Sequence, residues 1–302
     1  MKEIVIISGK GGTGKTSIAA SFAALAAGTA VMADCDVDAA DLHLILRPDV
    51  RNRAPFISGR TAVIRQDNCI RCGGCLSYCR FGAIRHDNKG AGEATFTIDP
   101  VACEGCGVCV RFCPVQAIDF PEQVCGEWFV SDTRFGPMVH ARLGVAAENS
   151  GRLVTLVRTE AKKIARERTA RYLLVDGSPG IGCPVIASLT AADQALIVTE
   201  PTVSGDHDLR RVAQLTRRLG VPAAVCVNKW DISPAATDAI RVFAQSNGMT
   251  FAGTVRYDKA VTRAQQAEQT VTEYGADGAA MDIRNVWDAV VTAACGRQTG
   301  DV

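Results

Sequence analysis

Residues 4–16 read IVIISGKGGTGKT, an apolar run that leads into a glycine-rich loop and a Lys-Thr pair. Glycines let backbone N–H groups turn toward phosphate oxygens, the lysine reaches the β- and γ-phosphates, and the threonine hydroxyl binds Mg²⁺. The loop follows a predicted strand, Ile4–Ser8, and precedes a predicted helix, Lys15–Ala27. This context predicts a nucleotide site formed by Gly11, Gly12, Thr13, Gly14, Lys15, Thr16 and Ser17, with Thr16 also a ligand of Mg²⁺.

A second interpretation of the same loop is a dinucleotide-binding turn. Gly9, Gly11 and Gly14 satisfy its GxGxxG pattern, and Asp34 follows where such proteins carry an acidic residue. The pair Lys15-Thr16 favours the phosphate loop, because a dinucleotide-binding helix has no need of it. A glycine turn with a purely structural role is the third interpretation.

Strands and helices alternate along most of the chain. Helical segments are predicted at Ala39–Leu46 and, from apolar residues at helical spacing, between Leu153 and Ala165. Further strands are predicted at Ala30–Asp34, Tyr172–Val175, Ala195–Thr199, Ala223–Val227 and Thr250–Val255. This order predicts an α/β fold with a doubly wound, mostly parallel sheet.

The alternation breaks from about Pro55 to Cys125, where two similar cysteine runs occur. Residues 69–84 read CIRCGGCLSYCRFGAI and residues 103–118 read CEGCGVCVRFCPVQAI. The spacing Cys-x₂-Cys-x₂-Cys-x₃-Cys is typical of bacterial ferredoxins with two [4Fe–4S] clusters. We therefore predict an inserted α+β ferredoxin-like domain at 58–125, between segments 1–57 and 126–302 of the nucleotide-binding domain.

In such a pair of runs, three thiolates of one run and the last cysteine of the other hold each cluster. This assigns one cluster to Cys69, Cys72, Cys75 and Cys113, and the other to Cys103, Cys106, Cys109 and Cys79. Zinc is the alternative, although a tight run that occurs twice fits cubanes better. Arg80 stands where proline usually follows the fourth cysteine, a change expected to alter local potential and solvent access but not ligation.

Bulk properties restrict location and partners. With 33 basic and 32 acidic residues the formal charge is +1, so no general attraction to nucleic acid or anionic membrane is expected. The apolar start is too short for a signal peptide, and the Ala-rich stretch 17–33 is interrupted and shorter than a membrane span. We expect a cytoplasmic protein with no membrane segment, whose 13 cysteines bind metal rather than form disulfides.

The sequence KGGTGKT, with Lys10 and Lys15, resembles the double-lysine (deviant Walker A) loop of the superfamily of MinD, ParA, Mrp and the nitrogenase iron protein. The resemblance implies an ATP-dependent homodimer in which Lys10 reaches the partner's ATP. Asp34-Cys35-Asp36 is similar to switch I, which implies that Asp36 orients the attacking water and Asp34 supports Mg²⁺. RYLLVDGSPG resembles Walker B and switch II, which implies that Asp176 belongs to the Mg²⁺ site.

A further motif, Asn228-Lys229-Trp230-Asp231, ends another predicted strand. In the superfamily the asparagine reads adenine, whereas Asn-Lys-x-Asp also reads guanine in GTPases. The double-lysine loop favours ATP over GTP.

Five cysteines lie outside the two runs. Cys35, Cys226 and Cys295 are expected to be small buried residues. Cys183 occupies a position similar to that of a ligand of the subunit-bridging cluster in the nitrogenase iron protein, and Cys125 would have to be the second ligand; we favour a packed thiol instead. The four histidines are assigned no role.

Taken together, the motifs resemble superfamily ATPases with an inserted ferredoxin domain. The C-terminal segment lacks MinD's basic amphipathic membrane helix, and the chain has no further CxxC of an Mrp-type cluster carrier. The leading hypothesis is a Mg²⁺-dependent ATPase that gates electron transfer to a protein partner. A maturation factor for a metal cofactor, and a positioning or partition ATPase with structural clusters, are the alternatives.

Overall fold

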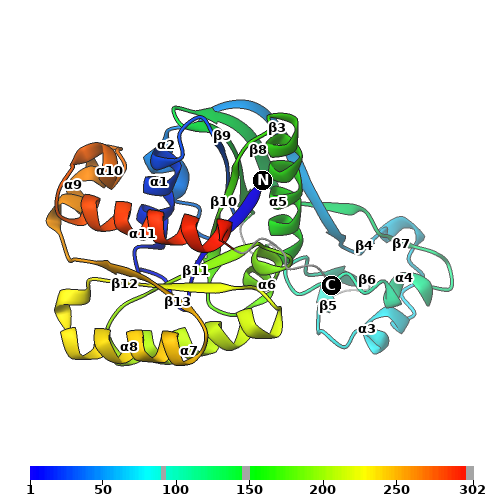
Figure 1. Cartoon of the computed structure of the whole chain (residues 1–302). Helices are drawn as coiled ribbons and strands as arrows, with labels where there is room; N and C mark the ends of the chain where they lie inside the picture. Colours follow the sequence, from blue (N-terminus) through cyan, green and yellow to red (C-terminus); the bar gives the residue numbers. More distant parts are fainter. Residues whose placement is uncertain (90–92, 145–149, 297–302) are drawn as a thin grey trace, which may run out of the picture. The chain divides into compact units, whose positions relative to one another are not determined.

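Strand β1 (Lys2–Ser8) lies in the interior of a large sheet, which explains its continuous apolar sequence. Its residues Ile4 to Ile7 are all fully buried, as expected for a strand covered on both faces. It pairs in parallel with β10 (Tyr172–Pro179) on one side and β11 (Gln194–Thr199) on the other. The phosphate-loop sequence therefore emerges from the middle of the sheet (Figure 1).

The structure, a computed structural model, describes residues 1–89, 93–144 and 150–296. They form two compact units. The first, here called the sheet unit, contains Met1–Ala54, Trp128–Leu143 and the described chain from Ser150 onward. The second, here called the cysteine unit, consists mainly of Pro55–Glu127.

Within the described residues the main sheet has nine strands. Their order is β13 (Thr250–Val255), β12 (Ala223–Asn228), β11, β1, β10, β2 (Ala30–Asp34), β9 (Gly136–Leu143), β8 (Glu122–Thr133) and β3 (Asp49–Arg60). All pairings from β13 to β9 are parallel. The carboxyl ends of β1, β2, β10, β11 and β12 therefore meet at one edge, where ligands bind in such sheets.

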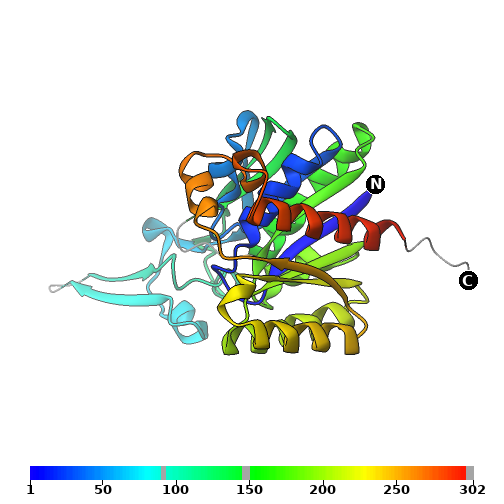
Figure 2. The same ribbon diagram turned by 60° about the vertical axis from the view of Figure 1, so that its left-hand side comes forward.

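Helices cover both faces of the sheet. On one face, α1 (Lys15–Leu25) and α11 (Ala279–Cys295) pack against alternate residues of β1, including Ile4 and Ile6. The other face carries α5 (Ser150–Glu167), α6 (Cys183–Leu189), α7 (Val203–Arg218) and α8 (Pro234–Ser246). Figure 2 shows α11 and the pair α7 and α8 on opposite faces. Short elements α2 (Leu42–Leu46), η2 (Trp230–Ile232), α9 (Lys259–Gln266) and α10 (Val271–Tyr274) complete the unit.

The cysteine unit repeats one small motif. The first copy contains β4 (Val63–Ile64), η1 (Gln66–Asn68), α3 (Gly74–Tyr78) and β5 (Ile84–Lys89); the second contains β6 (Glu93–Ile98), α4 (Val108–Arg111) and β7 (Ile118–Asp119). The outer strands β4 and β7 pair with each other, and so do the inner strands β5 and β6, both antiparallel. A small core of Ala62, Ile64, Ile84, Phe96 and Ile118 packs against six of the cysteines of the two runs.

The prediction of an α/β fold with a large, mostly parallel sheet is confirmed. The helix predicted at Ala39–Leu46 begins only at Leu42. Strands β8 and β9 were not predicted. Only Arg134 and Phe135 separate them, and this turn lacks the Asn-Gly or Asp-Gly signal by which two-residue hairpins are recognised.

Arg134 anchors this turn to the rest of the sheet unit. Its guanidinium donates to the carbonyl oxygens of Ile45 (3.0 Å) and Leu46 (2.9 Å), at the end of α2. It also binds both carboxylate oxygens of Glu273, each at 2.8 Å. These contacts give a structural explanation for an arginine in the turn.

Two of the four histidines, which sequence reasoning left without a role, meet beside the same hairpin. His140 is 9% exposed, and its ring stacks on Phe129 with centroids 4.9 Å apart and lies 6.4 Å from the ring of His43. Its Nε2 shares a hydrogen bond with Ser131 Oγ (2.9 Å). Burial, and then the neighbouring His43, lower the pKa of His140 from 6.5 to about 4.

We expect acid to destabilise the sheet unit through His140. The unfolded chain binds a proton there below pH 6.5 while the folded chain stays neutral down to about pH 4, so stability present above pH 6.5 is lost as pH falls through this window. The loss attributable to His140 is about 2 kcal/mol between pH 7 and pH 5. Urea unfolding at each pH, followed by tryptophan fluorescence, will measure the free energy of unfolding, and His140→Gln will abolish the loss due to His140. An unchanged pH dependence in the variant would reject the assignment.

Candidate functional site

The phosphate loop forms the turn between β1 and α1. Gly12 and Gly14 have φ of +79° and +87°, which favour glycine. A Cβ at Gly14 would also meet the side-chain amide of Asn228, which would have to shift. Gly11 and Gly12 are exposed, and space around both is open.

Three aspartates surround the ammonium of Lys15, which is buried. Its Nζ lies 2.6 Å from Asp176 Oδ1 and 3.3 Å from Asp36 Oδ2, and Thr16 Oγ1 is 3.4 Å away. Asp34, at the end of β2, is fully buried and accepts a hydrogen bond from the backbone N–H of Asp36 (3.2 Å). The strand ends thus bring together the residues assigned from the phosphate loop, switch I and Walker B.

The three carboxylates exceed the charge of the single lysine. Burial raises the pKa of Asp34 well above its usual value, and the nearby Asp176 raises it further. Burial opposes the charge of Lys15, but Asp176 and Asp36 raise its pKa overall. Among the described residues, the buried atoms Asp34 Oδ2, Asp176 Oδ2 and Thr13 Oγ1 have no hydrogen-bond partner. A site with surplus carboxylate charge and free oxygens suits a hard divalent cation such as Mg²⁺.

The segment Asp34-Cys35-Asp36 is hydrogen-bonded directly to the strand that carries Asp176. The N–H of Cys35 donates to the carbonyl of Asp176 (2.8 Å), and Ser178 Oγ donates to the carbonyl of Cys35 (2.7 Å). The register of β10 against β1 shifts between Asp176 and Pro179, the stretch that contains Ser178. Farther on, the N–H of Gly180 donates to the carbonyl of Ser8 at the start of the phosphate loop (2.9 Å).

Lys10 lies at the other side of the loop, where sequence reasoning missed two contacts. Its Nζ is 2.9 Å from Ser204 Oγ and 3.5 Å from Glu200 Oε2. Glu200 also binds Lys229 Nζ at 2.5 Å, so one carboxylate joins both lysines. Glu200 directly follows β11, and the rule that ligand-site residues follow parallel strands was the available signal.

The Asn228 motif is tied to the phosphate loop within the protein. Asn228 Nδ2 donates to the carbonyl of Thr13 (2.8 Å), and its Oδ1 accepts from the N–H of Lys229. Asp231 Oδ1 accepts from the N–H of Tyr257 (2.7 Å), and Ser17 Oγ accepts from Gln265 Nε2 (2.9 Å). The roles predicted for Asn228, Asp231 and Ser17 in nucleotide binding stay predictions.

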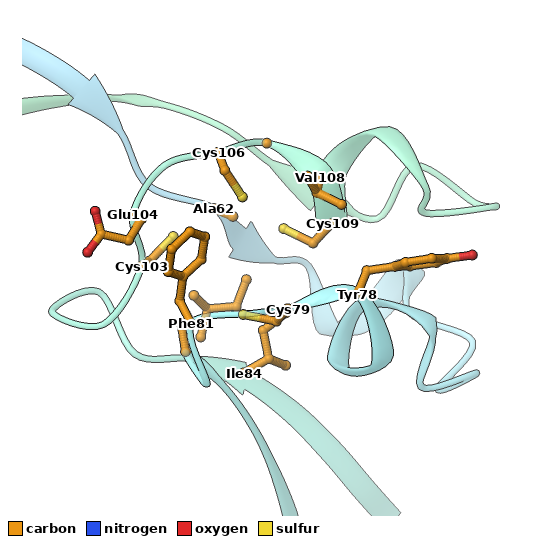
Figure 3. Close-up of a pocket in the computed structure, with 13 residues that line it drawn as sticks. Ala62, Tyr78, Cys79, Phe81, Ile84, Cys103, Glu104, Cys106, Val108 and Cys109 are labelled. Atoms are coloured by element: carbon orange, nitrogen blue, oxygen red, sulfur yellow. The ribbon is translucent and has the colours of Figure 1, made fainter.

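The eight cysteines of the repeat line two pockets of similar size in the cysteine unit. Their empty volumes are about 360 Å³ and about 350 Å³. The first is lined by Cys79, Cys103, Cys106 and Cys109, whose side chains surround one space in Figure 3, and the second by Cys69, Cys72, Cys75 and Cys113. Each pocket thus takes three cysteines from one run and one from the other.

The two cysteine loops also share one backbone conformation. Positive φ values occur in equivalent pairs: Arg71 (60°) and Gly105 (62°), then Gly73 (73°) and Gly107 (70°). Burial raises the pKa of the third cysteine of each run, Cys75 and Cys109. Among the described residues, no three His, Cys, Asp or Glu side chains gather as a site for a single metal ion.

The remaining cysteines differ partly from expectation. Cys35 and Cys226 are buried, as predicted. Cys295 and Cys183 are exposed, so the predictions of a buried and a packed thiol are wrong. Cys295 is the last residue of α11 and Cys183 the first residue of α6, and at both helix ends the side chain stays accessible. Cys125 Sγ donates to the carbonyl of Ser58 (2.8 Å) in the cysteine unit.

The fold and the site define the class of P-loop nucleotide-binding proteins. The phosphate loop joins β1 to α1 in a parallel sheet, and Asp34, Asp36 and Asp176 lie at neighbouring strand ends. The sequence profile described as the CobQ/CobB/MinD/ParA nucleotide binding domain matches residues 4–271. The chain belongs to this family. None of the helices described here is both long and apolar enough to cross a membrane.

The chain is also similar to individual proteins of known sequence or structure. Uncharacterized protein MJ0578 of Methanocaldococcus jannaschii is 35% identical over 230 residues, which cover 75% of this chain and 78% of that protein. MinD of Pyrococcus horikoshii, solved with Mg-ADP, shares the fold with a TM-score of 0.57 and 16% identity, covering 97% of each chain. Pyruvate synthase subunit PorD of M. jannaschii is 38% identical over 56 residues, 18% of this chain and 60% of PorD.

Proposed function

We propose that this protein is a Mg²⁺-dependent ATPase whose nucleotide state controls electron transfer through two [4Fe–4S] clusters in the inserted cysteine unit. The observation that carries the proposal is the pair of similar pockets, each lined by four cysteines, in a chain that also has a complete phosphate loop. The likeness of a 56-residue stretch to PorD, a subunit of a pyruvate synthase, supports the redox assignment. The protein partner is an electron donor or acceptor.

The proposed roles at the nucleotide site follow from charge. Lys15, held beside Asp176 and Asp36, stabilises the β- and γ-phosphates, and the glycine-rich backbone binds their oxygens. Asp34, Asp176 and Thr16 hold Mg²⁺, which neutralises phosphate charge when bound. Asp36, only 8% exposed, orients the attacking water. In the proposed ATP-bound homodimer, Lys10 reaches the nucleotide of the partner subunit.

ATP is proposed over GTP on the resemblance of the double-lysine loop. Asp231, the residue of the motif that would read guanine, accepts a hydrogen bond from the backbone N–H of Tyr257 (2.7 Å).

The fit of the cysteine unit to cubanes rests on its donor set. Four thiols line each pocket, and apolar residues such as Ala62, Ile84 and Ile64 complete the walls. Thiolates of this kind bind iron–sulfur clusters. Burial raises the pKa of Cys75 and Cys109, which favours their neutral form, so the positive charge of the bound iron has to stabilise their thiolates. When bound, the clusters accept and donate single electrons.

The chain connects the two functions through two strands. β3 begins in the sheet unit, after switch I and α2, and ends in the cysteine unit; β8 returns from the cysteine unit to the sheet unit. Both are neighbours in the main sheet. A change at Asp36 on ATP binding can therefore be transmitted along the chain to the cysteine unit.

We expect the cluster potentials to differ by about 40–130 mV between nucleotide states. Coupling free energies between two sites are commonly about 1–3 kcal/mol, and a tenfold change in the equilibrium constant of a one-electron reduction corresponds to about 59 mV. Redox titrations with ADP and with a non-hydrolysable ATP analogue will measure the shift. By reciprocity, reduction must change ATP affinity by the same free energy. Lys15→Ala, which should not bind the phosphates, is the control and should show no shift. Potentials within about 10 mV and equal affinities would contradict gating.

A further inference from the structure

Two aromatic side chains form an exposed pair between the two cysteine loops. The rings of Tyr78 and Phe112 stack with centroids 4.8 Å apart, yet the residues are 49% and 54% exposed. Aromatic side chains usually bury this area in a core or an interface. Leu76, on the same short helix as Tyr78, is 40% exposed and adds to the apolar surface.

The pair lies next to both pockets. Tyr78 directly precedes Cys79, which lines one pocket, and Phe112 directly precedes Cys113, which lines the other. Figure 3 shows the ring of Tyr78 extending away from the first pocket toward its outside. A protein that covers the aromatic pair therefore comes close to both sets of cysteines.

The two cysteine loops carry a net positive charge. Segments 69–81 and 103–115 contain three arginines, Arg71, Arg80 and Arg111, and one acid, Glu104. Arg80 and Arg111 are exposed, and within the described residues neither side chain forms an ion pair or a hydrogen bond. Arg111 is the chain neighbour of Phe112, and Arg80 follows Tyr78 by two residues.

Three acidic residues elsewhere in the cysteine unit are paired with other arginines. Asp99 binds Arg85 at 2.6 Å, Asp119 binds Arg65 at 2.7 Å and Glu122 binds Arg60 at 3.2 Å. These pairs leave the charges of Arg80 and Arg111 uncompensated. Exposed aromatic and arginine side chains together are the composition of interaction hot spots.

We propose that Leu76, Tyr78, Arg80, Arg111 and Phe112, here called the loop surface, dock an acidic electron-carrier protein. The proposal rests on the proposed function, because it needs clusters in the two pockets. The aromatic pair supplies the apolar centre of the contact, and the arginines attract the acidic face of the carrier. One electron leaves the reduced centre of the carrier and enters an oxidised cluster of this protein; no bond forms or breaks and no proton has to move.

The test uses the full chain with its clusters, and an acidic bacterial ferredoxin with two [4Fe–4S] clusters as the probe. Affinity is measured calorimetrically under anaerobic conditions at low and at high salt. We expect salt to weaken wild-type binding, and Arg80→Glu/Arg111→Glu to raise Kd at least about tenfold at low salt. Arg80→Gln/Arg111→Gln should give an intermediate Kd. Tyr78→Ala/Phe112→Ala should raise Kd about tenfold at both salt concentrations.

The matched control is Arg166→Glu/Arg218→Glu, which makes the same charge change at two exposed arginines of the sheet unit; it should alter Kd less than twofold. Iron content and the signal of dithionite-reduced clusters are recorded for each variant. The docking proposal would be overturned by unchanged ferredoxin affinity in loop-surface variants with intact clusters, or by an equal loss of affinity in the control. Tighter binding of duplex DNA than of ferredoxin would overturn it as well. A wild-type chain that binds no iron would instead overturn the proposed function, and this proposal with it.

Discussion

Substituting Lys15 by alanine is expected to lower ATP hydrolysis by at least about 10³-fold, because its buried ammonium is the group that we propose to stabilise the phosphates in a low-dielectric site. The loss is larger than for an exposed lysine since Lys15 is 5% exposed and lies 2.6 Å from Asp176. Phosphate release per chain, measured with saturating Mg²⁺, checks the expectation.

A second effect should accompany the loss of activity. Without Lys15, the buried carboxylates Asp34, Asp36 and Asp176 have no cation among them, and removal of one partner of a buried ion pair costs about 3–5 kcal/mol. The variant should therefore unfold at lower denaturant concentration, and added Mg²⁺ should restore part of the difference. Lys163→Ala, at an exposed lysine of α5, is the control. A variant that keeps a tenth of the wild-type rate would exclude the proposed role.

The wild-type chain purified without oxygen is expected to hold about eight iron atoms, because each pocket has the four thiols that one cubane needs. Cys72→Ala and Cys106→Ala should each lower the iron content to about four, since the substitutions affect different pockets. The phosphate loop should still bind nucleotide in both variants. Iron analysis and the EPR signal after reduction measure the outcome.

Cys295→Ala removes an exposed thiol of α11 and serves as the matched control, with iron content unchanged. About four irons in the wild type would mean that Arg80 marks a degenerate site. Zinc in place of iron, or equal iron in all variants, would reject the cluster assignment.

The sequence by itself predicted the parallel α/β sheet and the phosphate loop, because both depend on local patterns. A strand buried on both faces must be apolar throughout, as Ile4 to Ile7 are. A loop that binds phosphate between strand and helix needs glycines followed by Lys15-Thr16. The cysteine spacing likewise predicted the ligand sets of Cys79 and Cys113, although only iron analysis tests them.

Tertiary structure alone decided the features that depend on residues far apart in the chain. Lys15 meets Asp36 and Asp176 because β1, β2 and β10 end at the same edge of one sheet. Glu200 joins Lys10 to Lys229 for the same reason.

Packing between distant segments also explains three features that local sequence patterns did not predict. They are the exposed Cys183 and Cys295, the cluster of His43 and His140, and the stacked pair Tyr78 and Phe112. Spacing along the chain determines which face of an element a residue occupies. Whether another element covers that face depends on packing, and packing brings together residues whose separation in the sequence carries no local signal.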